Sequence, residues 1–170
     1  INNAGWTHKN QPLLDVDEAT FRKVMDINVL SIFHMTHAIV PHWREIGGGV
    51  MINIGSTAGL RPRPGLTWYN ASKGAVNLMS KSLAVDLAGD KIRVNCVCPG
   101  ITEATGVWSN VSSDYVKNMN LPMEEVIKKF TAKVPLGRLA RIEDVVNVTC
   151  FLASKKAGYV TGQAINITGG

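Results

Sequence analysis

Apolar residues recur every three or four positions from Asp17 to about Trp43, which is the spacing of a helix with one apolar face. Asp15 and Asp17 are suitable caps for the start of this helix. Pro41 predicts a bend or an end, because proline lacks the amide hydrogen that a helix interior needs. The apolar positions are Phe21, Val24, Met25, Val29, Ile32, Phe33 and Val40.

Further along the chain, short apolar runs alternate with segments of helical periodicity. The opening residues INNAG predict the last residue of a strand and the loop that follows it. A long segment after residue 100 is mixed in character and predicts a loop with one short helix. The predicted strands are 49–56, 92–100 and 164–168, the predicted helices are 68–88 and 142–153, and the loop is about 101–134.

This alternation predicts an α/β fold. Strands separated by helices of ten or more residues pair in parallel through right-handed crossovers. In such sheets, ligands bind beyond the carboxyl ends of the strands. Three stretches rich in small residues lie where strands end, which lets the backbone approach a ligand closely: 2–5, 55–59 and 99–101.

The composition indicates a globular chain of one domain. Of the 170 residues, 45% are hydrophobic and 18% are charged. We find no secretory signal and no uninterrupted apolar run of the roughly 18 residues that span a bilayer, so we expect a cytoplasmic protein without a membrane segment. The three cysteines, Cys96, Cys98 and Cys150, match neither a disulfide framework nor a zinc site.

Charge and histidine placement argue against two further classes of function. The net charge of +5 comes from scattered residues, and the densest cluster (128–133) has lysines without interleaved aromatic residues, so we expect no nucleic-acid binding. His34 and His37 lie three apart on the first predicted helix without further ligands, so we expect no metal site.

Four polar residues stand out as candidates for chemistry. Tyr69 and Lys73 are four apart, so on a helix they share a face about one turn apart. Ser56 ends a predicted strand 13 residues earlier (69 − 56), and Asn28 interrupts the apolar stripe of the first helix. Taken singly, each also has a purely structural explanation: a surface pair, a turn-forming serine or a core amide with its hydrogen bonds satisfied.

As an ordered series, these residues and the motifs around them resemble the short-chain dehydrogenase/reductase family in its compact single-domain form. The resemblance runs over all 170 residues, which makes it far more specific than a Tyr-x-x-x-Lys match alone. The matching motifs are NNAG at 2–5, DINVLSIF around Asn28, NIGSTAG around Ser56, YNASK at 69–73, VNCVCPG at 94–100 and VTGQAINITGG at the end.

The resemblance implies a Rossmann-like doubly wound parallel sheet and a catalytic tetrad of Asn28, Ser56, Tyr69 and Lys73. It also implies hydride exchange with NAD or NADP that interconverts a secondary alcohol and a ketone. Tyrosine has an ordinary pKa of about 10, so a role as acid and base requires a shift toward about 7. We expect the Lys73 ammonium and the positive nicotinamide to supply that shift.

The resemblance further implies the cofactor contacts. The family's glycine-rich phosphate turn has no copy in these residues, and the choice between NAD and NADP is not determined. We therefore expect residues 1–170 to be the C-terminal portion of the domain, inactive when isolated. Thr102 and Thr105 depart from the family pattern, so a role for either hydroxyl is doubtful. The implied contacts are Asn3, Tyr69, Lys73, Pro99, Gly100 and Thr102.

The resemblance also gives expectations for the substrate, the partners and the alternative functions. The segment 101–134 is expected to cover a small carbonyl or alcohol substrate through Trp108, Tyr115, Met119 and Met123, and Trp6 is a further candidate. Helices 17–45 and 68–88 are expected to pack subunits into a homodimer or homotetramer. An epimerase or dehydratase of the same family, or a non-catalytic binding or regulatory protein on this fold, is the alternative.

Overall fold

The computed structural model describes residues 1–170 and contains a parallel three-stranded sheet. Its strands are β1 (Gly49–Ile54), β2 (Ile92–Pro99) and β3 (Ala164–Ile167), in that order across the sheet. Asn2 adds one isolated parallel bridge to Asn53 on the outer side of β1, where the opening residues were predicted to end a strand. The predicted α/β architecture with parallel strands is therefore confirmed.

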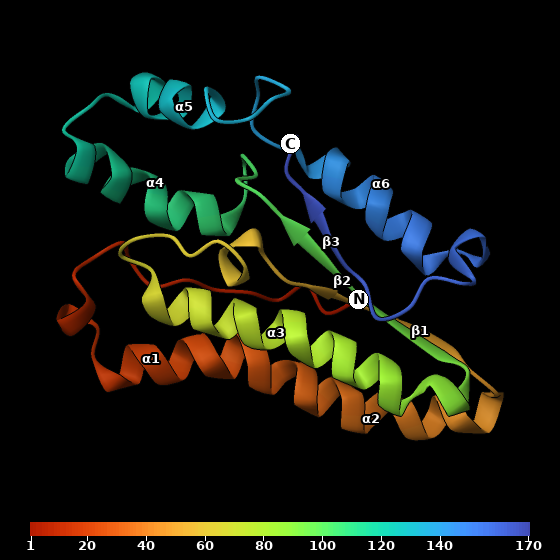
Figure 1. Ribbon diagram of the computed structural model, residues 1–170. Coiled ribbons are helices and arrows are strands. Elements are labelled where there is room, and N and C mark those ends of the chain that lie inside the picture. The colour runs from red at the N-terminus through yellow and green to blue at the C-terminus, as the bar shows by residue number, and fades with distance from the viewer.

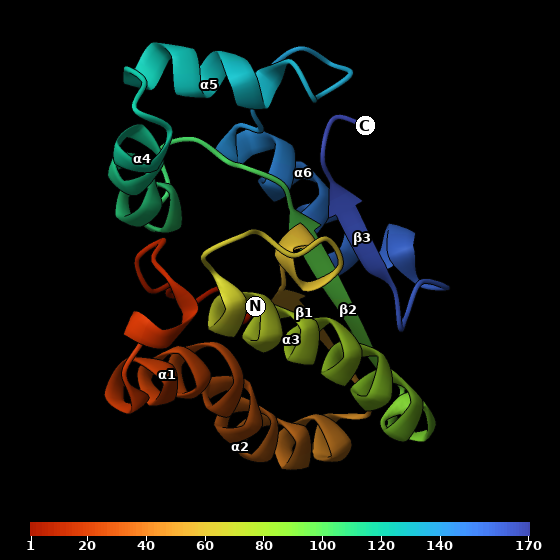
Figure 2. The ribbon, with the colours of Figure 1, turned by 60° about the vertical axis from the view of Figure 1, so that its left-hand side comes forward.

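Helices cover both faces of this sheet. The first long helical run consists of α1 (Glu18–Met25), a π-helical turn (Asp26–Leu30) and α2 (Ser31–Ile46). This run lies beside α3 (Thr67–Asp86) on one face, and α6 (Ile142–Ala153) lies on the other (Figure 1). Figure 2 shows the sheet between these two layers. Asp17 caps α1 as predicted, because its side chain accepts from the amide of Thr20 at 2.7 Å.

Two sequence predictions about helices need correction: of the bend or end predicted at Pro41 the end does not occur, and the segment 101–134 contains more helix than predicted. Pro41 does not end the first helical run, which continues to Ile46 and stops at Gly47 with φ of +84°. Proline removes a single hydrogen bond, whereas Val40 and Trp43 on either side of it pack into the core. The segment 101–134 holds two helices rather than one short helix, α4 (Gly106–Met119) and α5 (Met123–Thr131), and Thr105 caps the first of them.

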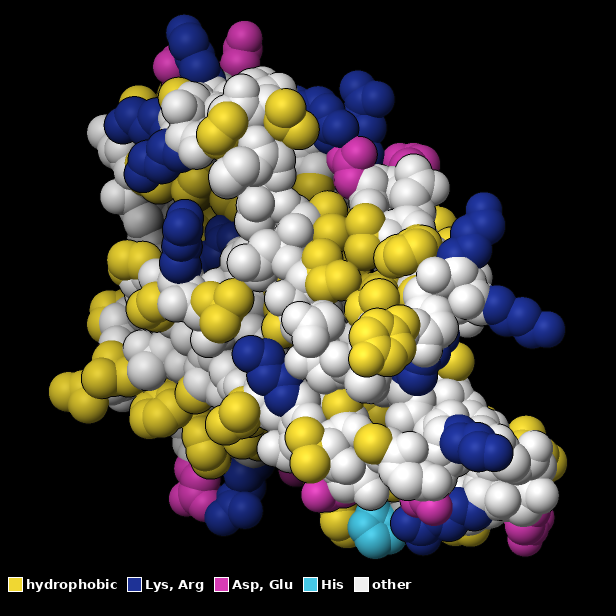
Figure 3. Space-filling model, turned by 45° about the vertical axis from the view of Figure 1, so that its right-hand side comes forward, with side chains coloured by type: hydrophobic (Ala, Val, Ile, Leu, Met, Phe, Trp, Pro, Cys, Tyr) yellow, Lys and Arg dark blue, Asp and Glu magenta, His cyan; other side chains and the backbone are white.

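The helical run Glu18–Ile46 also passes a test of length and composition for a membrane-crossing helix. Two observations favour a helix packed on the sheet instead. Val24 and Ile32 are buried, and the buried amide of Asn28 is bonded to Ser72 of α3. Figure 3 shows apolar side chains in several clusters on one face of the molecule, with lysines and arginines scattered among them.

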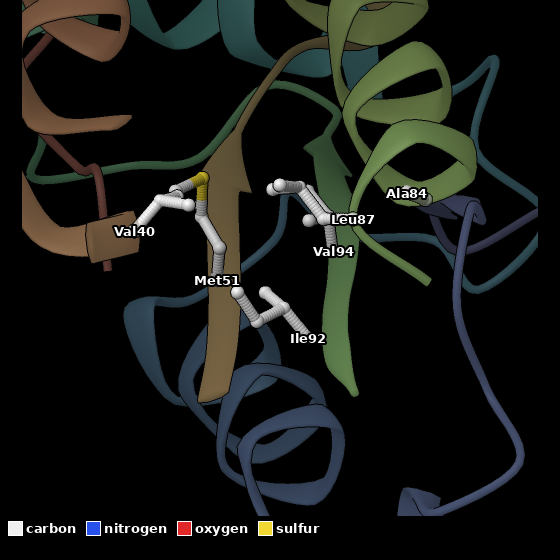
Figure 4. Packing of buried hydrophobic residues seen from close by; sticks show 6 residues of the cluster. All are labelled: Val40, Met51, Ala84, Leu87, Ile92 and Val94. Atoms are coloured by element: carbon white, nitrogen blue, oxygen red, sulfur yellow. The ribbon is translucent and has the colours of Figure 1, made fainter. Parts of the chain in front are cut away.

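Strand residues alternate between the two helical layers, and this alternation builds a core on each side of the sheet. On one side, Met51 and Val94 pack with Val40 of α2 (Figure 4). On the other side, Ile52 and Val97 pack with Leu152 of α6. Because β2 is covered on both faces and paired on both edges, its carboxyl end is a rigid support for the residues that follow it.

Candidate active site

Ser56 lies where β1 gives way to a single turn of 3-10 helix (Thr57–Gly59). Its side-chain oxygen accepts a hydrogen bond from the amide of Ala58 at 3.0 Å, so the serine caps this turn. The side chain is 7% exposed and lines a cavity of about 670 Å³. The capping bond uses the oxygen as an acceptor, which leaves the hydroxyl proton free to donate.

Tyr69 and Lys73 lie one turn apart on α3 and line the same cavity. They are 6% and 4% exposed, so the predicted surface alternative for this pair does not apply. The Lys73 ammonium donates to the main-chain carbonyl of Ile54 at 2.8 Å. That bond joins α3 to the end of β1, two residues before Ser56.

Burial raises the pKa of Tyr69 above its ordinary value. A hydrogen bond with Ser56 and the charge of Arg63 oppose this effect without overcoming it. The expected lowering of the Tyr69 pKa toward 7 therefore does not occur in the chain without its cofactor. The pKa of Tyr69 stays high because the phenol is buried and the Lys73 ammonium is hydrogen-bonded to the carbonyl of Ile54.

Burial lowers the pKa of Lys73 to about 8, and the nearby thiols of Cys96 and Cys98 act in the opposite direction. No carboxylate lies within 4 Å of this ammonium, since none of the ion pairs involves Lys73. A lysine with a pKa near neutrality can give up and regain a proton under ordinary conditions.

Asn28 lies in the π-helical turn and is 1% exposed. Its amide nitrogen donates to the carbonyl of Trp6 at 2.9 Å and to the hydroxyl of Ser72 at 2.9 Å, while its oxygen accepts from the amide of Trp6 at 2.8 Å. It does not line the cavity. The side chain therefore fastens the loop after NNAG to α3, and π-helical turns of this kind are frequent at functional sites.

A buried polar cluster of Asn77, Cys96 and Cys98 lies next to Ser56. Asn77 of α3 donates to the carbonyl of Ser56 at 3.1 Å, and its oxygen lies 3.5 Å from the sulfur of Cys96 and 3.3 Å from that of Cys98. The two sulfurs are 3.7 Å apart on one face of β2. Only glycine fits at Gly55, because a side chain there would overlap Asn77 and lie 2.5 Å from the sulfur of Cys96.

The cavity also collects every residue predicted to contact the cofactor. It extends from the opening residues of the chain, across the ends of β1 and β2, to α4 and α6. At Gly100 the backbone itself borders the cavity, and an added side-chain carbon would only make ordinary contact, at 3.4 Å, with the carbonyl of Ile167. The predicted contacts that line the cavity are Asn3, Tyr69, Lys73, Pro99, Gly100 and Thr102.

These residues fit a nicotinamide cofactor. The cavity offers close backbone approach, an exposed amide at Asn3 and the cation of Lys73 without a carboxylate partner. Thr105 is used as a helix cap, because its hydroxyl oxygen accepts from the amide of Trp108 at 3.2 Å. Its side chain is therefore committed to starting α4, in line with the doubt about its role.

Part of the expected substrate segment reaches the cavity. Trp108 and Tyr115 of α4 line it, and their rings form a cluster with Phe130 of α5. Met119 and Met123 do not line it. Trp6 does not line it either; its ring lies under the ammonium of Lys23 at 4.4 Å.

The sequence reasoning missed two contributors to the cavity. Arg63 lies in the loop before α3 with prolines on either side, and the Arg-Pro-Arg-Pro sequence at 61–64 was the available signal. The second contributor is the outer face of α6, including Ile142, Val146 and Cys150. No sequence signal distinguished that face from the core face of the same helix.

Known proteins resemble this chain in sequence over its whole length. A family model described as enoyl-(acyl carrier protein) reductase matches residues 1–170. A 4-formylbenzenesulfonate dehydrogenase of Comamonas testosteroni is 38% identical over 170 residues, which are 100% of this chain and 65% of the relative. A 3alpha-hydroxysteroid dehydrogenase of Mediterraneibacter gnavus is 39% identical over 169 residues, 99% of this chain and 62% of the relative.

Solved structures resemble the chain in fold as well. A 3-ketoacyl-(acyl-carrier-protein) reductase from Brucella melitensis, complexed with NADH, matches with a TM-score of 0.88 and 36% identity, over 99% of this chain and 65% of that one. The chain belongs to the short-chain dehydrogenase/reductase family. It spans 62% to 65% of the length of the curated relatives described above.

Proposed function

We propose that this chain is the catalytic part of an oxidoreductase that interconverts a ketone and a secondary alcohol with NAD(H) or NADP(H). The observation that carries the proposal is the convergence of Ser56, Tyr69 and Lys73 on one cavity. The same cavity is lined by all the residues that the family resemblance assigns to the cofactor. Relatives named as dehydrogenases and reductases support the reaction class.

The bound cofactor supplies or accepts the hydride, and the chain's own residues manage the substrate oxygen and its proton. Ser56 donates its free hydroxyl proton as a hydrogen bond to that oxygen. Tyr69 donates its phenol proton during reduction and takes it back during oxidation. Burial raises the pKa of Tyr69, so it is a phenol at neutral pH in the chain alone. The Lys73 ammonium and the positive nicotinamide would lower that pKa toward the range that proton exchange requires.

Lys73 and Asn28 have supporting roles in this proposal. A pKa of about 8 would let Lys73 restore the proton of Tyr69. We assign its ammonium to the nicotinamide ribose as well, which the family resemblance implies and its place in the cavity wall supports. Asn28 acts as a positioning residue, because its amide holds the loop at Trp6 against α3.

The segment 101–134 is proposed to form the substrate side of the cavity, within a single domain that includes residues 1–170. Trp108 and Tyr115 give that side an apolar, aromatic wall. The relatives are named for an aromatic sulfonate, a steroid and a ketoacyl group. Substrate choice is therefore expected to depend on the residues of this wall.

We also propose a homodimer or homotetramer built on the first helical run and α3. Large apolar side chains are exposed on these helices, including Leu78 at 66% and Val85 at 77% exposure. Exposed apolar surface of this kind is commonly covered by a second copy in soluble oligomers. The remaining exposed members on this layer are Leu30, Phe33, Met35 and Ile46.

The test of the enzymatic proposal uses the intact protein with NADH or NADPH and a panel of ketones. We expect cofactor oxidation in step with alcohol formation, and a loss of that activity in Ser56→Ala. Binding of either cofactor without oxidation by any ketone would favour a non-catalytic protein on this fold and would overturn the proposal.

A further inference from the structure

Arg63 introduces a positive charge into the substrate side of the cavity. It lies in the loop between Gly59 and α3, is half-buried and lines the cavity together with Tyr69. Among the 26 lining residues, Arg63 and Lys73 are the cationic members, and no aspartate or glutamate is present. The guanidinium forms no ion pair with any carboxylate of the chain.

The backbone of Arg63 is fixed to the catalytic helix. Its amide donates to the side-chain oxygen of Asn70 at 3.3 Å, and its carbonyl accepts from the side-chain nitrogen of Asn70 at 2.9 Å. Asn70 follows Tyr69 directly on α3. Pro62 and Pro64 restrict the backbone on both sides, so the position of the arginine is tied to that of the catalytic tyrosine.

The surroundings of the guanidinium are mainly aromatic and apolar. It is hydrogen-bonded to Tyr115, and the carboxylate of Asp114 acts on that same phenol without forming an ion pair with the guanidinium. It lies beside the phenols of Tyr69 and Tyr115 and lowers the pKa of both, although burial raises each pKa overall. Leu66 and Val111, both buried, line the cavity next to these rings. A half-buried cation without a carboxylate partner has lost hydration without gaining an ion pair, and an anion supplied by a ligand would provide that pair.

We propose that Arg63 is a specificity-determining residue that binds a carboxylate or sulfonate group on the carbonyl substrate. This inference rests on the proposed oxidoreductase function. The substrate would present an apolar or aromatic body to Trp108 and Leu66 and its anionic group to the guanidinium. The planar guanidinium suits both anions, because it can donate two parallel hydrogen bonds to their oxygens.

The kinetic test compares 4-acetylbenzenesulfonate with 4-acetylbenzenesulfonamide, which have nearly the same shape and differ in charge. We expect the intact protein to reduce the sulfonate with a kcat/KM higher by about ten- to a hundredfold, the range for one charge-assisted hydrogen bond. Arg63→Gln should abolish most of that preference, and Arg63→Lys should retain part of it. Arg61→Gln is the matched control, because Arg61 is exposed and does not line the cavity.

A different role for Arg63 gives a different result. If the arginine acted only on the pKa of Tyr69, Arg63→Gln would shift the pH profile for both ketones alike and leave their ratio unchanged. That outcome would overturn the inference while the proposed function stood. If neither ketone were reduced, the enzymatic proposal would be in doubt, and binding would decide the question of Arg63.

The binding test is calorimetric titration of each compound into the intact protein in the presence of cofactor. Tighter binding of the sulfonate than of the sulfonamide, lost in Arg63→Gln and kept in Arg61→Gln, would support the inference. Equal binding of the two compounds, or no binding of the sulfonate, would overturn it whether or not turnover is seen.

Discussion

The ammonium of Lys73 is bonded to the main-chain carbonyl of Ile54 at 2.8 Å, inside the protein and without a carboxylate neighbour. This bond ties α3 to the end of β1, so the helix that carries Tyr69 and the strand end that carries Ser56 are held as one unit. The same ammonium is a buried charge, and because its pKa is about 8, its protonation depends on pH near neutrality.

That buried charge predicts a pH-dependent stability. The pKa of Lys73 is lowered from 10.5 to about 8 in the folded protein, so between these values the unfolded chain binds more protons. Lys73 should therefore contribute a rise in stability with pH through this window, by up to about 3 kcal/mol for a shift of this size, while the raised pKa values of Tyr69 and Cys98 act in the opposite direction at its upper end. Urea denaturation of the cofactor-free protein at several pH values measures the rise.

The Lys73→Met variant should lose this component of the pH dependence, because its side chain does not titrate. Lys81→Met, on the exposed side of α3, is the matched control and should keep it. Parallel stability curves for the wild type and Lys73→Met would mean that the ammonium is not destabilised by burial.

Two glycines near the site should respond in opposite ways to alanine. Gly55→Ala should destabilise the protein by about 1–3 kcal/mol, because the new carbon would overlap Asn77 and crowd Cys96. Gly74→Ala lies within α3 and would meet its nearest neighbour, the carbonyl of Gly59, at 3.6 Å. It should stabilise the helix by about 0.5–1 kcal/mol.

Denaturant midpoints of the two variants measure this difference. An unchanged midpoint for Gly55→Ala would show that the cluster of Asn77 and the two thiols yields easily. In that case it would not hold Ser56 in place.

Trp108→Ala should change the ranking of substrates more than the melting temperature. The indole lines the cavity and is half-buried, while the buried members of the cluster it packs against, including Val111 and Val126, remain in the variant. Kinetics on a ketone panel and a thermal melt measure the two effects. A large melting shift with an unchanged ranking would place Trp108 in the core or in a subunit contact.

Much of the fold was predictable because its signals are local. The apolar period and capping residues gave α6 at Ile142–Ala153 and the strands to within two residues at either end. The end of α2 was not predictable from Pro41, because burial of Val40 and Trp43 outweighs the hydrogen bond that proline removes. The helices α4 and α5 were underestimated, because α4 contains weak helix formers such as Asn110, Ser112 and Ser113. Both helices are nevertheless anchored in a buried apolar cluster through Val111, Tyr115 and Val126.

The candidate site was also predictable only in part. The motif order placed Ser56, Tyr69 and Lys73 at one edge of the sheet, and the cavity there contains all three. Hydrogen-bond partners could not be predicted, because Asn28 and Trp6 or Asn77 and Ser56 meet only through tertiary packing. The electrostatic contribution of Arg63 was missed for the same reason.

The proposed oligomer makes a prediction for the exposed face of α3. Leu78→Lys should reduce the mass of the intact protein in solution toward that of a monomer, because a charge would lie within the proposed apolar contact. Leu14→Lys is the control, since Leu14 is 93% exposed and lies outside both helices. Sedimentation velocity measures the mass, and an unchanged assembly in Leu78→Lys would exclude this face of α3 from the subunit contact.

The central claim is that the Tyr69 phenol exchanges the substrate proton in this cavity, and its direct measurement is the turnover of Tyr69→Phe in the intact protein. The variant keeps the buried ring, so cofactor affinity and melting temperature should change little, while ketone reduction should fall by at least about a hundredfold. Tyr159→Phe, at a fully exposed tyrosine, should reduce ketones at the wild-type rate. Wild-type turnover in Tyr69→Phe would contradict the account.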